Sequence, residues 1–200
     1  MYRAYREYFN QIAPEWHTKV SKEPLPLRDY LLRFGISPGD HVLDIGAGTG
    51  RVTLHLIDIV GPKGKVVAED ISDRMLELAK YILNGRSAYF TCSDACALSF
   101  KESSFDKIVC FSTFPHLYHP ILALEEMFRV LRPGGKLLIL HTCSSVRLNE
   151  LHASLGGIVS HDILPSALEM VPLLNRAGFE SRKIVETDEL YWVEAVKKVR

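Results

Sequence analysis

A glycine-rich segment at residues 42–50 limits the fold of this chain more than any other feature of its sequence. It reads Val-Leu-Asp-Ile-Gly-Ala-Gly-Thr-Gly and joins a short apolar run to a helical pattern. Glycine lets the backbone turn sharply and approach a ligand where a side chain would collide. A strand that passes through such a loop into a helix is typical of α/β proteins, which bind ligands at the carboxyl ends of their strands.

Short apolar strands alternate with helices on both sides of this loop. Ser72 is the expected N-cap of one helix, and Gly85 follows the end of that helix. Strands and helices in this rhythm form βαβ units, whose right-handed crossovers place helices on both faces of a parallel sheet. The pattern predicts strands at 41–46, 65–70, 87–92, 105–111 and 136–142, and helices at 51–60, 73–84 and 120–131.

The end of the chain departs from this rhythm. A helix is expected at 165–177, followed by two strands at 179–187 and 189–198 with a short connection at Thr187 and Asp188. So short a connection favours an antiparallel hairpin over another crossover. We therefore expect a Rossmann-like, doubly wound α/β fold whose mostly parallel seven-stranded sheet ends in an antiparallel C-terminal hairpin.

Two regions outside the alternating pattern are expected to cover a ligand. Residues 2–20 read as an aromatic-rich helix that Pro14 breaks or restarts, and residues 26–34 read as a second helix. We interpret residues 1–35 as an N-terminal helical lid on a single domain that spans the whole chain. Residues 144–164 show no clean periodicity and are interpreted as a substrate-covering insertion.

Composition excludes several classes of partner. Lys plus Arg and Asp plus Glu both number 24, so no net charge favours nucleic acid. The N-terminus lacks the apolar stretch of a secretory signal, and no apolar run is long enough to span a bilayer. The four cysteines include no C-x-x-C pair. We therefore expect a cytoplasmic protein without a zinc site.

The spacing of the glycines argues against a dinucleotide site. The dinucleotide fingerprint requires G-x-G-x-x-G, and Arg51 stands where its third glycine belongs. Asp44 lies two residues before the first glycine, and Asp70 ends the second strand about 20 residues after the last one. A carboxylate at the position of Asp70 can accept hydrogen bonds from both ribose hydroxyls, although Glu69 is a neighbouring competitor. Asp94 follows the third strand in the same way.

Taken in order, these segments resemble class I S-adenosylmethionine-dependent methyltransferases, and most of all the ubiquinone/menaquinone-biosynthesis-like small-molecule group. That group's x-G-x-D-x-S strand selects Asp70 over Glu69, and its F-x-x-x-A-x-x-W pattern resembles residues 9–16. Residues 130–137, Val-Leu-Arg-Pro-Gly-Gly-Lys-Leu, match the loop before its fifth strand. The chain departs from the pattern at Ser93, where glycine is usual, and at Ser99, where proline is usual.

The resemblance implies S-adenosylmethionine as the cofactor and S-adenosylhomocysteine as the product. It places the glycine loop at the amino-acid end of the cofactor, Asp70 at the ribose, Ile71 against the adenine and Asp94 at the adenine amino group. The implied cofactor-binding residues are Asp44, Gly46, Ala47, Gly48, Gly50, Asp70, Ile71, Asp94 and Ala95.

The sequence gives fewer indications of the residues that bind the methyl acceptor. His116 follows the fourth strand, where the family often places substrate contacts, and it is the candidate catalytic base. Tyr8, Trp16, His119 and His141 are candidate substrate contacts, although the N-terminal aromatic residues are equally suited to core or homodimer contacts. His141, His152 and His161 lie around the 144–164 insertion with Cys143 and Asp162, but their spacing matches no metal-ligand signature.

These features predict an enzyme that transfers a methyl group from S-adenosylmethionine to a small molecule. No metal ion or covalent intermediate is implied, because the sulfonium already carries an activated leaving group. Two alternatives stay open: a protein methyltransferase, and a non-catalytic S-adenosylmethionine-binding partner subunit. A nicotinamide-dependent reductase is disfavoured by Arg51 and by the C-terminal hairpin.

Overall fold

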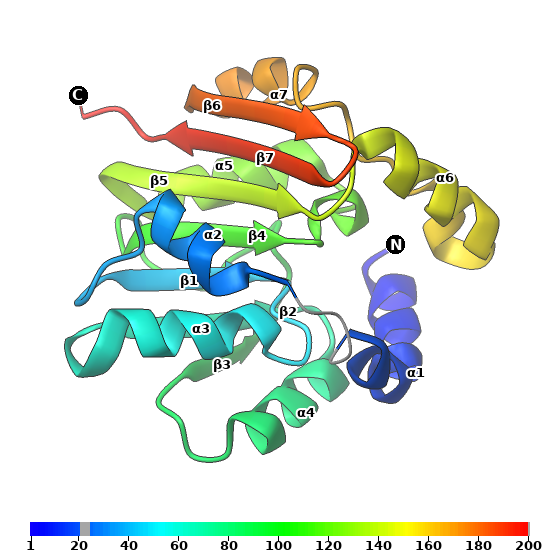
Figure 1. Ribbon diagram of the computed structural model, residues 1–200, viewed down its shortest axis with the longest axis horizontal. Helices are drawn as coiled ribbons and strands as arrows, with labels where there is room; N and C mark the ends of the chain where they lie inside the picture. Colours follow the sequence, from blue (N-terminus) through cyan, green and yellow to red (C-terminus); the bar gives the residue numbers. More distant parts are fainter. Residues whose placement is uncertain (21–24, 200) are drawn as a thin grey trace.

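A seven-stranded sheet with the strand order β3-β2-β1-β4-β5-β7-β6 forms the centre of the molecule (Figure 1). The computed structural model describes residues 1–20 and 25–199. Its strands are β1 (His41–Ile45), β2 (Lys65–Asp70), β3 (Tyr89–Cys92), β4 (Phe105–Phe111), β5 (Leu131–His141), β6 (Glu180–Thr187) and β7 (Leu190–Val196).

The sheet confirms the predicted topology. Strands β1 to β5 pair in parallel, whereas β7 pairs antiparallel with both β5 and β6. The chain runs from β1 outward to β3 and then returns to the other side of β1 for β4. The strand order therefore reverses between β1 and β4, which is where open α/β sheets leave a crevice for ligands.

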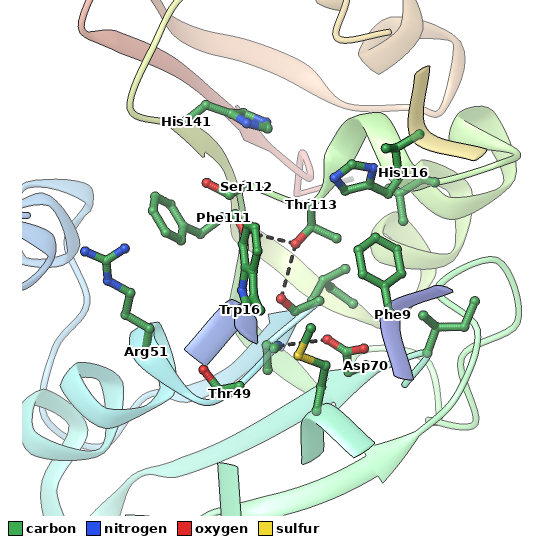
Figure 2. A pocket seen from close by; sticks show the side chains of 18 of the residues that line it. Phe9, Trp16, Thr49, Arg51, Asp70, Phe111, Ser112, Thr113, His116 and His141 are labelled. Atoms are coloured by element: carbon green, nitrogen blue, oxygen red, sulfur yellow. Dashed lines mark hydrogen bonds between the residues drawn. The ribbon is translucent and has the colours of Figure 1, made fainter. Parts of the chain in front are cut away.

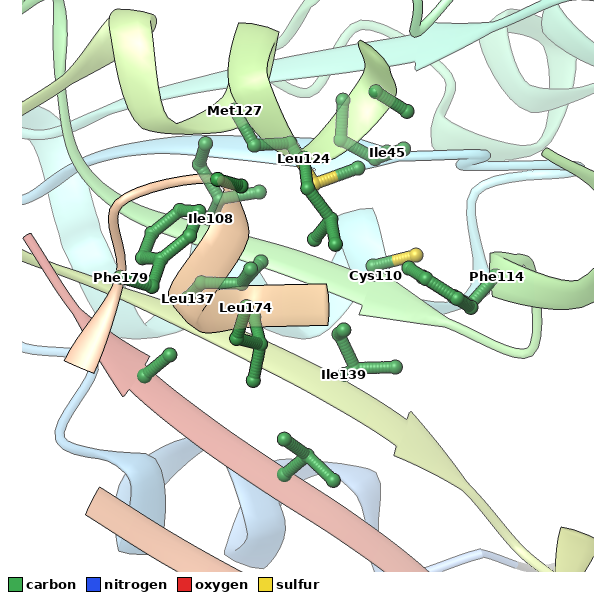
Figure 3. Close-up of a cluster of buried hydrophobic side chains, with 14 of the residues drawn as sticks. Ile45, Ile108, Cys110, Phe114, Leu124, Met127, Leu137, Ile139, Leu174 and Phe179 are labelled. Carbon is green, nitrogen blue, oxygen red and sulfur yellow. The ribbon is translucent and has the colours of Figure 1, made fainter. Parts of the chain in front are cut away.

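Helices cover both faces of the sheet because the central strands are apolar on both faces. On β4, Ile108 and Cys110 pack with α5 (Pro120–Val130) and α7 (Met170–Arg176), as Figure 3 shows for the surrounding cluster. Val109, between them, faces the second cluster with α2 (Leu27–Phe34) and α3 (Arg51–Val60). The same alternation continues along β5 and β7.

Helix α4 (Asp73–Leu83) begins as its sequence predicts. Ser72 is its N-cap, and the Ser72 hydroxyl accepts a hydrogen bond from the backbone N–H of Met75 at 3.0 Å. The helix ends at Asn84 in the left-handed conformation, immediately before Gly85. This cap starts the helix directly after β2. Asp70 is therefore held at the end of the strand, two residues before the N-cap Ser72.

Helix α1 (Tyr2–Val20) and helix α6 (Ser145–Leu155) stand at the carboxyl ends of the parallel strands (Figure 1). A short 3-10 helix, η3 (Gly157–His161), continues from α6. In contrast to α1, helix α2 belongs to the core: Leu27, Leu31 and Phe34 are buried against the sheet. Helix α2 is thus part of the core, and the lid stays a prediction for α1. Residues 21–24 and Arg200 lie outside the described residues.

Three local predictions were wrong. Residues 2–20 form one continuous helix although Pro14 lies inside it. Strand β5 already begins at Leu131, with an irregularity in its pairing to β4 between Phe105 and Lys107, so the Arg-Pro-Gly-Gly segment belongs to the strand. Helix α7 begins at Met170 and not at residue 165; before it, the Glu186 carboxylate accepts a hydrogen bond from the N–H of Ala167 at 2.7 Å.

The aperiodic reading of residues 144–164 also needs correction, because much of this segment is helical. Ser144 caps α6 by accepting a hydrogen bond from the N–H of Arg147. The helix carries a spacing of i, i+3 and i+7 in Leu148, Leu151 and Leu155, and all three line a pocket. This spacing could have revealed the helix from the sequence. Within the described part of the chain, no helix is long and apolar enough to cross a membrane.

Candidate functional site

A pocket of about 300 Å³ opens at the carboxyl ends of β1, β2, β4 and β5. Its size falls at the lower end of the range for small-molecule sites, roughly 300–1,000 Å³. The strand ends form one wall, and residues of α1 and α6 form the opposite one. Figure 2 shows Trp16 of α1 near Thr49 of the glycine loop, and Phe9 between Asp70 and His116.

The glycine loop requires glycine at its first position for two reasons. Gly46 has a φ of +64°, in the left-handed region, and a Cβ atom there would lie 2.2 Å from Thr113 Oγ1 and Cγ2. The Thr113 hydroxyl also donates a hydrogen bond to the Gly46 carbonyl at 3.2 Å, so β4 and the loop are tied together (Figure 2). A Cβ at Gly48 would lie 3.8 Å from Trp16 Nε1, which shows how closely α1 approaches the loop.

Asp70 is fixed at the end of β2 by the backbone. Its Oδ2 accepts a hydrogen bond from the N–H of Gly48 and its Oδ1 accepts one from the N–H of Ser72, both at 2.8 Å. Burial raises the pKa of Asp70 to about 6, although both backbone N–H groups favour the ionised form. The carboxylate joins the loop to α4 and still has lone pairs for a ligand hydroxyl.

Asp44 lies at the back of the pocket and is 1% exposed. Its Oδ2 accepts a hydrogen bond from the Thr53 hydroxyl at 2.6 Å, which ties β1 to the first turn of α3. Burial raises the pKa of Asp44 to about 7, and the nearby charge of Asp70 adds to this effect. The position suits the predicted role of setting the loop or binding a ligand ammonium.

Glu69 is a third buried carboxyl group beside these two. Burial and the charge of Asp70 raise its pKa well above the usual range, while the Ser93 hydroxyl donates to it at 3.0 Å. Asp44, Glu69 and Asp70 all line the pocket. Burial is the main cause of each raised pKa, and a cationic group bound among the three carboxyls would lower all three pKa values.

Asp94 lies on the loop after β3, and its Oδ1 accepts a hydrogen bond from the N–H of Cys96 at 2.8 Å. The Tyr118 hydroxyl donates to its other oxygen. Ile71 and Ala95 add apolar surface on the same side of the pocket. The expected adenine region thus combines an acceptor with apolar walls, and Tyr118 is a partner that the sequence did not indicate.

Two of the residues predicted to contact ligands do not line the pocket. Gly50 is the N-cap of α3 with a φ of +86°, and a Cβ there would lie 3.3 Å from the Cβ of Ala79, so it allows α3 and α4 to pack closely. His119 precedes α5, and its carbonyl accepts a hydrogen bond from Cys96 Sγ. The other predicted site residues all line the pocket, namely Asp44, Gly46, Ala47, Gly48, Asp70, Ile71, Asp94, Ala95, Tyr8, Trp16, His116 and His141.

The wall opposite the glycine loop carries histidine side chains in apolar surroundings. His141, at the end of β5, is buried, and no described residue hydrogen-bonds to its Nε2. Burial lowers the pKa of His141 to about 3, helped by His116 and His152. His141 is therefore neutral at ordinary pH.

The carboxylate that holds His116 is Asp162, which the sequence placed only among the histidines of the 144–164 segment, where a metal site stayed open. Nδ1 of His116 lies 2.6 Å from Asp162 Oδ2, and the other oxygen of Asp162 accepts a hydrogen bond from the Tyr5 hydroxyl. No sequence signal joins Tyr5 to Asp162, because 157 residues separate them. Among the described residues, no group of three or more His, Cys, Asp or Glu side chains has the geometry to hold a metal ion.

Comparison with known proteins connects this geometry to a family. Residues 42–135 match the model of a methyltransferase domain. The ubiquinone/menaquinone biosynthesis C-methyltransferase UbiE of Cronobacter sakazakii is 32% identical over 175 residues, which cover 74% of this chain and 69% of that protein. The enzyme of the same name from Ectopseudomonas mendocina is 36% identical, and the match covers 68% of this chain and 54% of that protein.

A solved structure agrees with the sequence matches. The S-adenosylmethionine-dependent methyltransferase of Aquifex aeolicus has a TM-score of 0.75 and 26% identity, and the match covers 90% of this chain and 96% of that one. By contrast, this chain spans about half the length of the first curated relatives that it matches. The agreement therefore extends over the sheet and the glycine loop, but not over the full length of those relatives.

Proposed function

Because this chain belongs to the class I S-adenosylmethionine-dependent methyltransferases, we propose that it transfers the cofactor's methyl group to a small molecule. The observation that carries this proposal is the set of buried carboxyl groups, Asp44, Glu69 and Asp70, around a glycine loop in one pocket. Burial raises their pKa values in the protein without ligand, and a cofactor that carries a sulfonium and an ammonium group would favour their ionised forms.

Several features of the pocket support S-adenosylmethionine as its ligand. The space that a Cβ would fill at Gly46 and Gly48 lets the backbone approach the amino-acid end. Asp70 is the ribose acceptor in this proposal, with Ile71 and Ala95 against the adenine and Asp94 at its amino group. When bound, S-adenosylmethionine supplies an activated methyl group, so the protein needs mainly to align the acceptor and exclude water.

We place the acceptor between His116 and the inner faces of α1 and α6. Phe9, Leu148, Leu151 and Leu155 make this part of the pocket apolar. The relatives are named for carbon methylation in ubiquinone and menaquinone biosynthesis, and a flat, largely apolar acceptor suits this lining. In this proposal residues 1–200 work as one domain, α1 is the lid, and the 144–164 segment covers the acceptor.

The concave pocket and the balanced charge favour a small molecule over nucleic acid or protein. The four cysteines are all unpaired, which accords with a cytoplasmic setting. A non-catalytic partner subunit would not need a histidine and a carboxylate oriented toward one another beside the cofactor pocket. A homodimer through the aromatic face of α1 is disfavoured, since Tyr5, Tyr8, Phe9 and Trp16 turn toward the protein's own pocket or core.

Methyl transfer can be followed directly. Purified protein is incubated with S-adenosylmethionine labelled in its methyl group and a fractionated cell extract, and the products are separated by size. We expect label in the small-molecule fraction. Label in protein or nucleic acid would refute the proposed acceptor class. Absence of label, with cofactor binding shown by calorimetry, would favour the non-catalytic alternative.

A further inference from the structure

We propose that Tyr118 is a positioning residue of the adenine site, where its hydroxyl holds the Asp94 carboxylate in the orientation that accepts a hydrogen bond from the 6-amino group of the cofactor. This inference rests on the proposed function and deepens it, because that proposal places the adenine of S-adenosylmethionine beside Asp94. It adds a residue that no sequence motif indicated. It also predicts how the protein distinguishes adenine from a purine without the amino group.

The Asp94 carboxylate is held by two donors and can still accept from a third. Its Oδ1 accepts a hydrogen bond from the N–H of Cys96 at 2.8 Å, and its Oδ2 accepts one from the Tyr118 hydroxyl. The two oxygens together offer about four lone-pair sites, so two remain for a ligand. Asp94 and Tyr118 both line the pocket and are half-buried. A ligand in the pocket therefore meets an acceptor that is already oriented.

Both donors to Asp94 are neutral groups. Burial raises the pKa of the Tyr118 phenol, and the neighbouring Asp94 adds to this effect, so the hydroxyl keeps its proton at neutral pH. Neutral donors orient the carboxylate without the charge neutralisation that an ion pair brings. A hydrogen bond to an ionised group is about twice as strong as one between neutral groups. The arrangement therefore fixes Asp94 and keeps it a strong acceptor.

The segments that carry Asp94 and Tyr118 are both fixed by helix α5. On the loop after β3, the N–H of Leu98 donates to the Glu126 carboxylate of α5 at 2.8 Å. The carbonyl of Leu98 accepts a hydrogen bond from the Arg129 guanidinium of α5, also at 2.8 Å. Tyr118 lies just before the first residue of the same helix. One rigid element thus sets both partners before a ligand arrives, which reduces the cost of binding.

A second contact between the same segments limits the movement of Tyr118. The Cys96 thiol donates a hydrogen bond to the carbonyl of His119 at 3.5 Å, and burial raises the pKa of this thiol to about 12, so it keeps its proton. The rings of Tyr118 and His119 pack edge to face, with their centroids 4.8 Å apart. Strands β2 and β1 separate β3 from β4 in the sheet. These contacts therefore join two segments that strand pairing alone does not bring together.

This geometry favours a hydrogen-bond donor at position 6 of the purine. An amino group there can donate to the Asp94 carboxylate, whereas a hydrogen atom bound to the ring carbon leaves that acceptor without the bond. Without the Tyr118 hydroxyl, Asp94 keeps the bond from Cys96 but loses its second anchor, so its carboxylate can rotate about the last side-chain bond. Loss of the hydroxyl should therefore weaken the binding of ligands that carry the amino group and of no others.

The test compares S-adenosylhomocysteine with the analogue that carries hydrogen in place of its 6-amino group, each titrated by calorimetry into the full chain. We expect the parent to bind the amino compound about 10- to 100-fold more tightly. Tyr118→Phe should reduce this ratio about three- to tenfold, with the affinity for the analogue unchanged. Tyr89→Phe, at an exposed tyrosine of β3, is the matched control and should keep the ratio of the parent.

Asp94→Ala shows whether Tyr118 acts through Asp94. This variant should bind the two ligands with similar affinity. Adding Tyr118→Phe to it should leave the ratio unchanged, because the carboxylate that the hydroxyl positions is gone. The melting temperature of each variant is recorded, since a merely structural role of Tyr118 would weaken both ligands equally and leave the ratio of affinities as it was.

The outcomes separate this inference from the proposed function. An unchanged ratio in Tyr118→Phe, equal losses for both ligands, tighter binding of S-adenosylhomocysteine or a further fall of the ratio in the double variant would overturn the inference alone. Equal binding of the two ligands by the parent would remove Asp94 from the adenine site and the inference with it, while the labelled-methyl experiment still decides the reaction. No binding of either ligand by the parent, together with no transferred label, would overturn both.

Discussion

The two sides of the pocket are built in different ways. On the strand-end side, Asp44 directly precedes the glycine loop in sequence, and Asp70, at the end of the neighbouring strand β2, is fixed by two backbone N–H groups. The opposite side, which α1, α6 and the η3 segment form, is called the cover side here. On it, His116 is held by the Asp162 carboxylate, and Asp162 is held by the hydroxyl of Tyr5, which is 157 residues away in the sequence. Sheet topology alone sets the first side, whereas packing between distant segments sets the second.

This difference predicts that the two sides of the pocket control different steps: cofactor binding on one side and methyl transfer on the other. Backbone hydrogen bonds hold the strand-end side in place before any ligand arrives, so its residues should control cofactor affinity. The cover side depends on α1 and the η3 segment being in place, so its residues should control the methyl-transfer step. Substitutions on each side can break or sharpen this division.

The largest effect is expected from Gly46→Ala. The added Cβ would need the space of the Thr113 side chain, 2.2 Å away, and would also strain a positive φ. We expect cofactor binding to fall by more than about 100-fold, measured by calorimetry. Gly35→Ala is the matched control, because Gly35 also has a positive φ but has open space around its Cβ position. Equal losses in both variants would show that backbone strain alone matters.

Asp70→Asn should weaken cofactor binding about 10- to 100-fold, because hydrogen bonds to a charged group contribute roughly 1.5–3 kcal/mol. The substitution keeps the shape of the side chain but leaves a single acceptor oxygen. Titration calorimetry measures the change, and Asp188→Asn, in the exposed turn between β6 and β7, is the control. Unchanged affinity in Asp70→Asn would remove this residue from the proposed cofactor site.

The pKa of Asp70 gives a pH dependence with two opposite signs. Burial places this pKa at about 6, above that of an unfolded aspartate. Between about pH 4 and 6 the folded protein without ligand therefore binds more protons than the unfolded protein does. Stability without cofactor should therefore fall as pH rises through this window, while cofactor affinity should rise by up to about tenfold.

Asp44 and Glu69 also have raised pKa values and contribute to the same trend in stability. Comparing melting curves and cofactor titrations of the parent with those of Asp70→Asn isolates the part that belongs to Asp70. A step in affinity near pH 6 that survives in this variant would assign the titration to another group.

Trp16→Ala should give the smallest effect and tests whether the division is complete. Trp16 belongs to the cover, yet its Nε1 lies within 3.8 Å of where a Gly48 Cβ would be. Loss of this contact should weaken cofactor binding about fivefold, equivalent to about 1 kcal/mol of apolar contact. Tyr81→Ala, which removes an exposed aromatic side chain from α4, is the control. A loss as large as that of Asp70→Asn would show that α1 is part of the cofactor site itself.

The sequence predicted the strand-end side of the pocket better than the cover side. The order of strands and helices, the hairpin and the strand-end carboxylates were all predicted, because each depends on contacts between neighbours in the chain or on the fixed direction of parallel strands. Gly50 was assigned to ligand binding on the same motif, but its position serves the packing of α3 on α4. A motif gives spacing, and spacing alone does not distinguish a ligand contact from a helix contact.

By itself the sequence determined a doubly wound sheet with acidic side chains gathered at one edge, since hydrophobic periodicity and the glycine loop leave few other ways to bury the apolar strands. Only the tertiary structure decided that α2 belongs to the core and that Asp162 and Tyr5 orient His116. The physical reason is that periodicity records burial within one element, whereas a hydrogen bond between side chains from distant elements leaves no period in the sequence.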